Sequence, residues 1–246
     1  MRYLILSDIH GNRQALEAVA RAAEGQYGRM LCCGDLVGYG ADPNAVVDWI
    51  RAHCSEIVRG NHDRACTGQE DLSWFNPVAR AAALWTQAAL TVENAAFVRA
   101  LPRGPLALDG FQLAHGSLFD EDEYVSDPEE AAGNFASLEG SLVFFGHTHI
   151  QGGYRWTRGR PAAIPGAPGP TGRRTMEIDS ACAYLVNPGS VGQPRDDDPR
   201  AAFAIYDSEA HTVVYRRVSY DVSEAQRRIG DAGLPWILAE RLSTGR

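Results

Sequence analysis

Lysine is absent from this chain of 246 residues: all 23 of its basic residues are arginine. The protein therefore has no Schiff-base lysine, no lysine general base and no P-loop of the usual kind, which needs a lysine for its phosphates. A compositional bias of the source is a sufficient explanation for the absence. The three exclusions hold regardless of its cause.

Cysteine and long apolar runs are also scarce. The five cysteines are an odd number without a Cys-x-x-Cys spacing, so we expect reduced, mostly buried thiols in a reducing cytoplasm. The apolar run at residues 3–6 is too short for a signal peptide. No uncharged apolar run approaches the roughly 18 residues of a membrane-spanning helix. We therefore expect a cytoplasmic protein without a membrane partner.

Positive charge is in deficit as well. The chain has 31 acidic residues and a net charge of −8, which argues against a broad nucleic-acid-binding surface. Hydrophobic residues make up 45% of the chain and charged residues 22%, the balance of an ordinary globular protein. The length fits one large domain or two small ones.

Short apolar runs that end in polar loops recur along the first half of the chain. They predict strands at residues 2–7, 30–33, 56–59, 111–114 and 141–145. Apolar residues at helical spacing after the first run, and again after Pro43, predict helices between strands. This alternation indicates a layered α/β protein.

Other segments of the chain have less regular sequence patterns. Residues 76–100 predict two helices broken near Thr91, and the acidic segment 120–130 predicts a solvated loop that leads into a helix at Pro128. Residues 158–174, rich in Pro, Gly and Arg, predict a mobile surface loop or a hairpin connection without helix or internal strand. A closing hairpin is expected over 201–206 and 212–218, followed by a helical stretch over 222–242 that Pro235 interrupts.

Metal-binding residue types follow directly after the predicted strands. Five of the seven histidines lie in five short segments: Asp8-x-His10, Gly34-Asp35, Gly60-Asn61-His62-Asp63, His115-Gly116 and Gly146-His147-Thr148-His149. Loops at the carboxyl ends of strands are where a rigid sheet can direct several side chains at one point. The set therefore predicts a metal site.

The residue types narrow the metal chemistry. Imidazole, carboxylate and amide oxygen suit divalent ions such as Mn, Fe, Zn, Co or Ni. The segments hold no cysteine, which argues against a thiolate structural zinc site. One ion would leave several ligands unused, whereas two ions that share a carboxylate use them all. Two such ions are the usual arrangement for displacement at phosphorus.

The order of these motifs resembles the calcineurin-like metallophosphoesterases. The resemblance runs from Asp8 to His149 with each ligand motif in order. It continues at the segment from Asn187 to Asp196, Asn-Pro-Gly-Ser-Val-Gly-Gln-Pro-Arg-Asp, which is similar to the bacterial phosphodiesterase branch. The resemblance implies a single domain over residues 1–246, an α/β four-layer αββα sandwich of two mixed β-sheets flanked by helices.

The resemblance also implies a dinuclear site and assigns its residues. The ligands of one ion would be Asp8, His10 and His149, those of the other Asn61, His115 and His147, with Asp35 bridging the two. Two divalent transition-metal ions are expected, manganese before iron, zinc, nickel or cobalt. A metal-bound hydroxide would attack a phosphodiester or a small phosphomonoester in line. His62 would not be a ligand but would stabilise the phosphoryl oxygens or protonate the leaving oxygen.

The chain departs from the protein-phosphatase members after the bridging aspartate. They have Asp-Arg-Gly there, whereas this chain continues from Asp35 as Leu-Val-Gly-Tyr-Gly. The difference argues against a protein phosphatase or a diadenosine tetraphosphatase. The missing arginine also favours a diester over a monoester, unless Arg59, Arg195 or Arg200 supplies the charge.

Two further residues are substrate-binding candidates. Arg195 suits a phosphate through its guanidinium group; the alternative is a surface ion pair with the aspartates at 196–198. Two alternatives are open for Asn12. It forms a hydrogen bond to a ligand or to phosphate, or it only caps a helix.

Two other functions are weighed against a phosphoesterase. A scaffold or binding protein that kept the fold should show eroded ligands, and a nuclease should show a basic, aromatic-lined stripe; the sequence has neither feature. The expected partner is a small phosphoester substrate, without strong nucleic-acid binding. The sequence leaves a homo-oligomer open.

Overall fold

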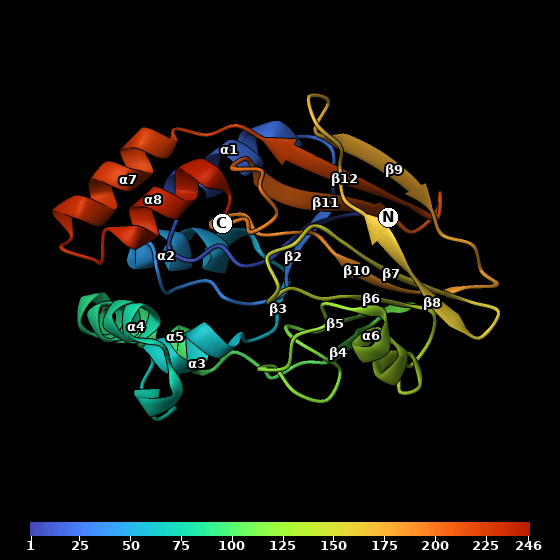
Figure 1. Ribbon diagram of the computed structural model, residues 1–246, viewed down its shortest axis with the longest axis horizontal. Helices are drawn as coiled ribbons and strands as arrows, with labels where there is room; N and C mark the ends of the chain where they lie inside the picture. Colours follow the sequence, from blue (N-terminus) through green and yellow to red (C-terminus); the bar gives the residue numbers. More distant parts are fainter.

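Two six-stranded β-sheets stacked face to face form the centre of the computed structural model, which describes residues 1–246 apart from the side chain of Trp74 (Figure 1). The first sheet has the order β3-β2-β1-β11-β12-β9, with strands β1 (Arg2–Leu6), β2 (Arg29–Cys32), β3 (Glu56–Ile57), β9 (Arg173–Glu177), β11 (Ala201–Asp207) and β12 (Thr212–Val218). The second has the order β4-β5-β6-β10-β7-β8, with strands β4 (Leu106–Leu108), β5 (Phe111–Leu113), β6 (Leu142–Phe144), β7 (Gly152–Thr157), β8 (Arg160–Pro165) and β10 (Ala183–Asn187). Parallel and antiparallel pairs occur in both, so both sheets are mixed.

Strand β1 is buried on both faces, which explains its unbroken apolar sequence. Tyr3 and Ile5 point to the core between the sheets, where Phe144 of the second sheet also lies. Leu4 and Leu6 point to the opposite side, into a core shared with helices. This alternation is the period of two that a strand imposes on its side chains.

Helices cover the outer faces of both sheets. Against the first sheet pack α1 (Arg13–Ala23), α2 (Pro43–His53) and α5 (Val92–Arg99), which contribute apolar residues to the same outer core as β1. Against the second packs α6 (Pro128–Phe135), through Ala131 and Phe135. The result is helices, sheet, sheet and helix, so the predicted αββα sandwich is confirmed.

The remaining helices lie to one side of the sandwich (Figure 1). Helices α7 (Val222–Asp231) and α8 (Ile237–Thr244) pack on each other and on α4 (Pro77–Ala89) in a separate apolar cluster that includes Tyr39. The short helix α3 (Asn61–Cys66) follows β3, and the 3-10 turn η1 (Leu72–Trp74) follows α3. Because Tyr39 belongs to the apolar cluster formed by α4, α7 and α8, the C-terminal helices pack against the loop that follows β2.

Most predicted elements are present. The break near Thr91, the helix start at Pro128, the closing hairpin β11–β12 and the interruption at Pro235 are all confirmed. The predicted strand over 56–59 is formed only at Glu56–Ile57.

The prediction of a surface loop over 158–174 is wrong in part. Residues 160–165 form β8, which pairs with β7 as a hairpin, and β9 begins at Arg173. Both β8 and β9 lie at sheet edges. An edge strand needs ladder bonds on one side only, so it tolerates the prolines that led us to exclude an internal strand.

The scarcity of long apolar runs and of cysteine led to two expectations about the structure. None of the helices in the described part of the chain is long and apolar enough to cross a membrane. All five cysteines are free.

Candidate metal centre

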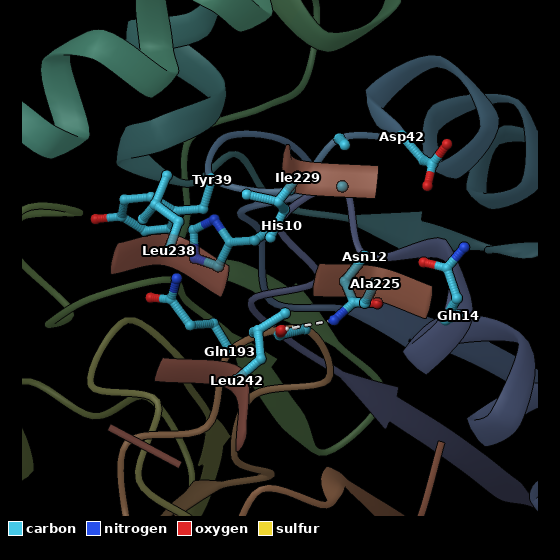
Figure 2. A pocket seen from close by; sticks show the side chains of 14 residues that line it. His10, Asn12, Gln14, Tyr39, Asp42, Gln193, Ala225, Ile229, Leu238 and Leu242 are labelled. Atoms are coloured by element: carbon cyan, nitrogen blue, oxygen red, sulfur yellow. Dashed lines mark hydrogen bonds between the residues drawn. The ribbon is translucent and has the colours of Figure 1, made fainter. Parts of the chain in front are cut away.

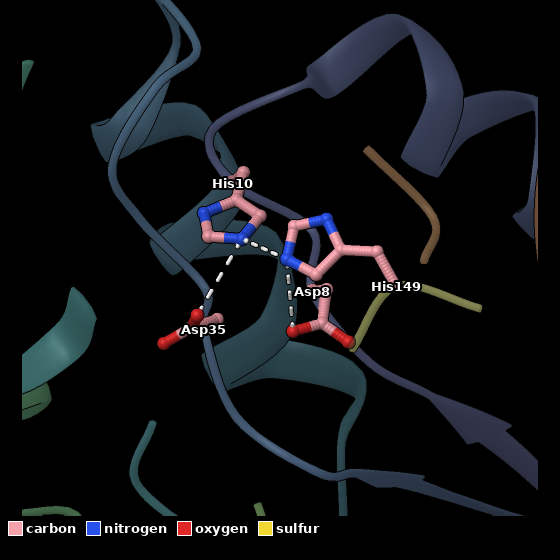
Figure 3. A group of neighbouring side chains, drawn as sticks. All are labelled: Asp8, His10, Asp35 and His149. Atoms are coloured by element: carbon pink, nitrogen blue, oxygen red, sulfur yellow. Dashed lines mark hydrogen bonds and ion pairs between the residues drawn. The ribbon is translucent and has the colours of Figure 1, made fainter. Parts of the chain in front are cut away.

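The loops after β1, β2, β5 and β6 bring six of the seven predicted ligands together in two groups that share Asp35. Figure 3 shows the first group. One group consists of Asp8, His10, Asp35 and His149, and the other of Asp35, His115 and His147. Within each group, one ligand atom from every residue lies within 4.8 Å of the others. These side chains come from loops far apart in sequence, and all of them are buried.

Backbone carbonyls orient three of the histidine rings. The Nδ1 atoms donate to the carbonyl oxygens of Val37 (from His10, 3.0 Å), Cys33 (from His115, 2.8 Å) and Gln193 (from His149, 2.6 Å). The Nε2 atom of each ring is therefore turned toward the carboxylates of the site. Such a bond from the far nitrogen is how proteins hold metal-binding histidines.

Neither of the two histidine rings in the first ligand group, His10 and His149, can donate a hydrogen bond to the other. The Nε2 atoms of His10 and His149 lie 3.1 Å apart, and both are lone-pair carriers because their Nδ1 atoms hold the hydrogens. Burial lowers the pKa of both rings well below the usual value for histidine, so both are neutral. Two facing lone pairs repel each other unless a cation accepts both, and this arrangement therefore fits a metal ion.

Asp35 lies between the two groups. Its Oδ2 atom is buried, has no hydrogen-bond donor among the described residues, and is 3.4 Å from Nε2 of both His10 and His115. Its Oδ1 atom accepts from the backbone N–H of His62 at 2.9 Å. One oxygen is thus held by the protein and the other points at both ligand groups, as a bridging carboxylate would.

The second group gains an amide oxygen from helix α3. Oδ1 of Asn61 is 3.2 Å from Nε2 of His115, beside Asp35. Burial opposes a charge on His115, but the carboxylates of Asp35 and Asp8 and the hydrogen bond to Cys33 together outweigh it and raise the pKa of that histidine to about 10. The environment therefore favours positive charge at this point.

His147 is the one ligand candidate oriented through Nε2. This atom donates to the carbonyl oxygen of Asp122 at 3.1 Å, which leaves Nδ1 as the ligand atom. The ring also stacks on Tyr124, with 4.0 Å between centroids. Asp122 belongs to the acidic segment 120–130, so part of that segment supports the site.

The acidic segment was expected to be a solvated loop, and for Glu121 this is wrong. Glu121 is 4% exposed and forms ion pairs with Arg59 and Arg64. A buried carboxylate is tolerable only when paired in this way. Arg59, one of the arginines considered for phosphate, is therefore already neutralised.

Backbone strain is concentrated at the same site. Nine non-glycine residues have a positive φ, and six of these nine lie at the site. Five are ligand candidates, namely Asp8, His10, Asp35, His147 and His149, and the sixth is Tyr39, which packs on His10. This left-handed conformation is unfavourable for residues with a Cβ and is typical of functional sites. The strain is independent support for the site, because the sequence motifs do not contain it.

Asp63 holds the loop that carries Asp35. Its carboxylate accepts four backbone N–H groups: Asp35 (2.9 Å), Leu36 (2.8 Å), Val37 (3.3 Å) and Gly60 (3.1 Å). It therefore joins the loop after β2 to the start of α3. Its role is to position the backbone, not to orient the ring of His62.

We expect Asp63→Asn to destabilise the protein by about 2–4 kcal/mol, since two of the four N–H groups would face an NH₂ group in place of an acceptor. The melting temperature should fall by roughly 5–15 °C. A thermal melt monitored by circular dichroism measures this.

The matched control is Asp221→Asn. Asp221 also accepts a backbone N–H, from Glu224 at 2.9 Å, but at the exposed start of α7. Asparagine caps a helix as well as aspartate does, so its effect should stay within about 0.5 kcal/mol. Equal effects of the two variants would contradict the role given to Asp63.

His62 faces the two ligand groups without joining either. Its ring centroid is 5.0 Å from that of His10 and 4.4 Å from that of Tyr39. Its Nδ1 atom is buried without a partner among the described residues. Burial lowers the pKa of His62 to about 4, which makes the ring neutral near pH 7.

The two substrate-binding candidates differ in the structure. Asn12 caps α1 by accepting from the backbone N–H of Ala15, and its amide donates to Oη of Tyr220. The amide also donates to the carbonyl oxygen of Gly192 (Figure 2). Both of its polar atoms are used within the protein, which supports the helix-cap alternative over a phosphate contact.

Arg195 has no carboxylate within ion-pair distance among the described residues. The expected alternative, an ion pair with the aspartates at 196–198, is not formed: Asp196 pairs with Arg217, Asp197 with Arg246 and Asp198 with both Arg200 and Arg217. Arg195 instead donates to Oε1 of Gln193 at 3.0 Å and lies over the ring of Tyr39.

A cavity borders the site on the side of the C-terminal helices (Figure 2). It is lined by His10, Tyr39 and Gln193 together with Leu238 and Leu242 of α8. Its volume of about 10 Å³ has room for no more than one water molecule. It is therefore not a substrate site, but it defines which face of α8 is turned to the metal centre.

The chain is similar to known proteins over most or all of its length. The family model described as "Calcineurin-like phosphoesterase superfamily domain" matches residues 1–211. An uncharacterised protein of Methanocaldococcus jannaschii is 34% identical, covering 98% of this chain and 97% of its own.

Two solved structures are similar over the full chain. A metallophosphoesterase from Sphaerobacter thermophilus is 36% identical with a TM-score of 0.86, covering 100% of this chain and 99% of its own. A hypothetical protein from Pyrococcus horikoshii has a TM-score of 0.79 at 19% identity, covering 100% and 98% of the two chains, which shows the fold alone.

Proposed function

Because the chain belongs to the calcineurin-like phosphoesterase superfamily, we propose that it is a hydrolase that cleaves a phosphoester with the help of two divalent metal ions. The observation that carries the dinuclear proposal is Oδ2 of Asp35, which is equally close to His10 and His115 and has no protein donor. Asp35 is fully buried without an arginine partner among the described residues, and its side chain accepts one hydrogen bond, so a cation would offset its charge.

The proposed ligand sets are those of the sequence motifs. One ion would be held by Asp8, His10 and His149, the other by Asn61, His115 and His147, with Asp35 shared. Nitrogen and oxygen donors in this mixture suit manganese, iron, zinc, cobalt or nickel, and we favour manganese. When bound, two such ions lower the pKa of water and offset the negative charge of a phosphoryl group.

The chain's own residues would do the rest of the chemistry. His62 lies beside both ligand groups with a free ring edge, so we assign it contact with the substrate. It would either hydrogen-bond a phosphoryl oxygen or give a proton to the leaving oxygen. Asp63 keeps the loop of Asp35 against α3, so that the shared carboxylate and His62 hold fixed positions.

The substrate is a phosphodiester or a small phosphomonoester. The missing arginine after Asp35 favours the diester, as the sequence predicts. Arg195 can supply a charge for a monoester, since it is free of acidic partners, whereas Arg59 and Arg200 are ion-paired. We further propose a cytoplasmic location, with which the free cysteines agree.

The test is turnover of aryl phosphates. We expect protein stripped with a chelator to be inactive and manganese to restore hydrolysis of an aryl phosphodiester or monoester by about 100-fold or more, since bound metals contribute several kcal/mol. The ratio of the two rates gives the ester preference. Protein that stays inert toward both esters in excess manganese would refute the proposed function.

A further inference from the structure

Two arginines near the metal centre have no acidic partner. Three arginines in the described structure have a buried Nε atom without a hydrogen bond: Arg195, Arg217 and Arg241. Arg217 is nevertheless ion-paired with Asp196 and Asp198. No carboxylate of the described residues lies within 4.0 Å of Arg195 or Arg241, so their charges are uncompensated.

The geometry of α8 places Arg241 beside Arg195. Residues 238, 241 and 242 share one face of a helix, because neighbours on a helix surface are three or four positions apart. Leu238 and Leu242 line the cavity with Tyr39 and Gln193 (Figure 2), and Gln193 is the residue to which Arg195 donates. The end of α8 is held there too, since Asp197 donates to the carbonyl oxygen of Gly245 at 3.0 Å.

The electrostatics agree with this placement. Burial, and after it the charge of Arg195, lowers the pKa of Arg241. Two like charges next to each other in a partly buried place are unfavourable without an anion. Guanidinium groups bind phosphate oxygens with matching geometry, so phosphate is the anion that they fit best.

Tyr39 contacts both the catalytic groups and Arg195. One side of its ring packs on His10 and His62, with centroids 4.7 Å and 4.4 Å away, and Cζ of Arg195 is 5.8 Å from its centroid. Its φ of 60° holds the ring in a strained left-handed position. Arg195 is also held next to the first ligand group through its backbone N–H, which donates to the carbonyl oxygen of His149 at 3.2 Å.

We propose that Arg195 and Arg241 form an anion subsite that binds a second phosphate group of the substrate, next to the ester that is cleaved. The proposal rests on the proposed function and narrows it to phosphoesters that carry another phosphate. The charge of the scissile group would be offset by the two metal ions. The two additional guanidinium groups thus serve a further anion.

The experiment uses nucleotides as carriers of one or two phosphates. Binding of adenosine 5′-monophosphate, adenosine 5′-diphosphate and adenosine 3′,5′-bisphosphate to manganese-loaded protein is measured by titration calorimetry. The last two distinguish adjacent from separated phosphates. The variants are Arg195→Gln and Arg241→Gln, and the matched control is Arg227→Gln, an exposed arginine of α7 paired with Glu224 and Asp231.

We expect a compound with two phosphates to bind wild-type protein at least about 10-fold more tightly than the monophosphate. Arg195→Gln and Arg241→Gln should each remove that advantage, and Arg227→Gln should keep it. One charge-assisted contact corresponds to a change of roughly 10- to 100-fold. No advantage in the wild type, or an advantage that survives Arg241→Gln, would overturn the subsite.

This readout does not depend on turnover. If wild-type protein shows the binding advantage but hydrolyses no aryl ester, the proposed function fails and the subsite stands. If it hydrolyses aryl esters but binds one and two phosphates equally, the subsite fails and the proposed function stands.

Discussion

Asp35→Asn is expected to remove both metal ions together and to lower turnover by roughly 1,000-fold or more, since bound metals contribute several kcal/mol. The reason lies in how the carboxylate is held. Oδ1 of Asp35 accepts the backbone N–H of His62, so the oxygen of an asparagine would take that position. The NH₂ group would then lie between His10 and His115, where it cannot bind a cation.

Metal content by mass spectrometry and aryl ester turnover measure the effect. The control is Asp42→Asn, because Asp42 is also a buried aspartate but pairs with Arg228, away from the ligand groups. It should keep both ions. Loss of one ion alone in Asp35→Asn would contradict the shared ligand, and unchanged metal content would remove Asp35 from the site.

Substitution of His62 is expected to separate metal binding from turnover. His62→Ala should keep both ions but reduce kcat by about 10²- to 10⁴-fold, the usual contribution of a positioned acid or base. The ring belongs to neither ligand group, and the backbone N–H that supports Asp35 remains after the substitution.

Because His62 packs on Tyr39 and Phe75, the alanine variant leaves a gap in the site. His62→Asn, which fills more of that space, should show the same separation of kcat from metal content. His53→Ala is the control, since His53 is exposed and stacks on Trp49. Wild-type kcat in both His62 variants would exclude the residue from the mechanism, and loss of metal would make it a ligand.

Much of the candidate site could be predicted because its residues follow strand ends. Strand β1 ends at Leu6 and is followed by Asp8 and His10, and β6 ends at Phe144, shortly before His147 and His149. Because β1 belongs to the first sheet and β6 to the second, the face-to-face packing of the two sheets brings these ends together. The ends themselves are located by apolar runs in the sequence alone. The prediction of ligand types therefore needed no tertiary information.

The supporting residues could not be predicted in this way. Asp63 was visible in its motif, but three of its four backbone donors come from the loop after β2, 26 to 28 residues away, which only the fold brings near. Arg241 lies in an ordinary amphipathic helix near the end of the chain. The role proposed for Arg241 depends on the packing of α8 against Tyr39 and on the lack of an acidic partner among the described residues. Neither feature can be predicted from the local sequence.

The strands at the sheet edges could not be predicted for a related reason. Strand β8 contains Pro161 and Pro165, and its sequence alone argues against a strand. Its pairing with β7 on one side only makes these prolines tolerable. A strand's position in its sheet is a property of the fold, so the local pattern could not supply it.

The most direct test of the account is the anomalous scattering of manganese in crystals of the metal-loaded protein. We expect two peaks separated by about 3.5–4 Å. One should lie among Asp8, His10 and His149 and the other among Asn61, His115 and His147, with Asp35 between them. A single peak, or peaks away from Asp35, would contradict the shared carboxylate from which the proposed function is argued.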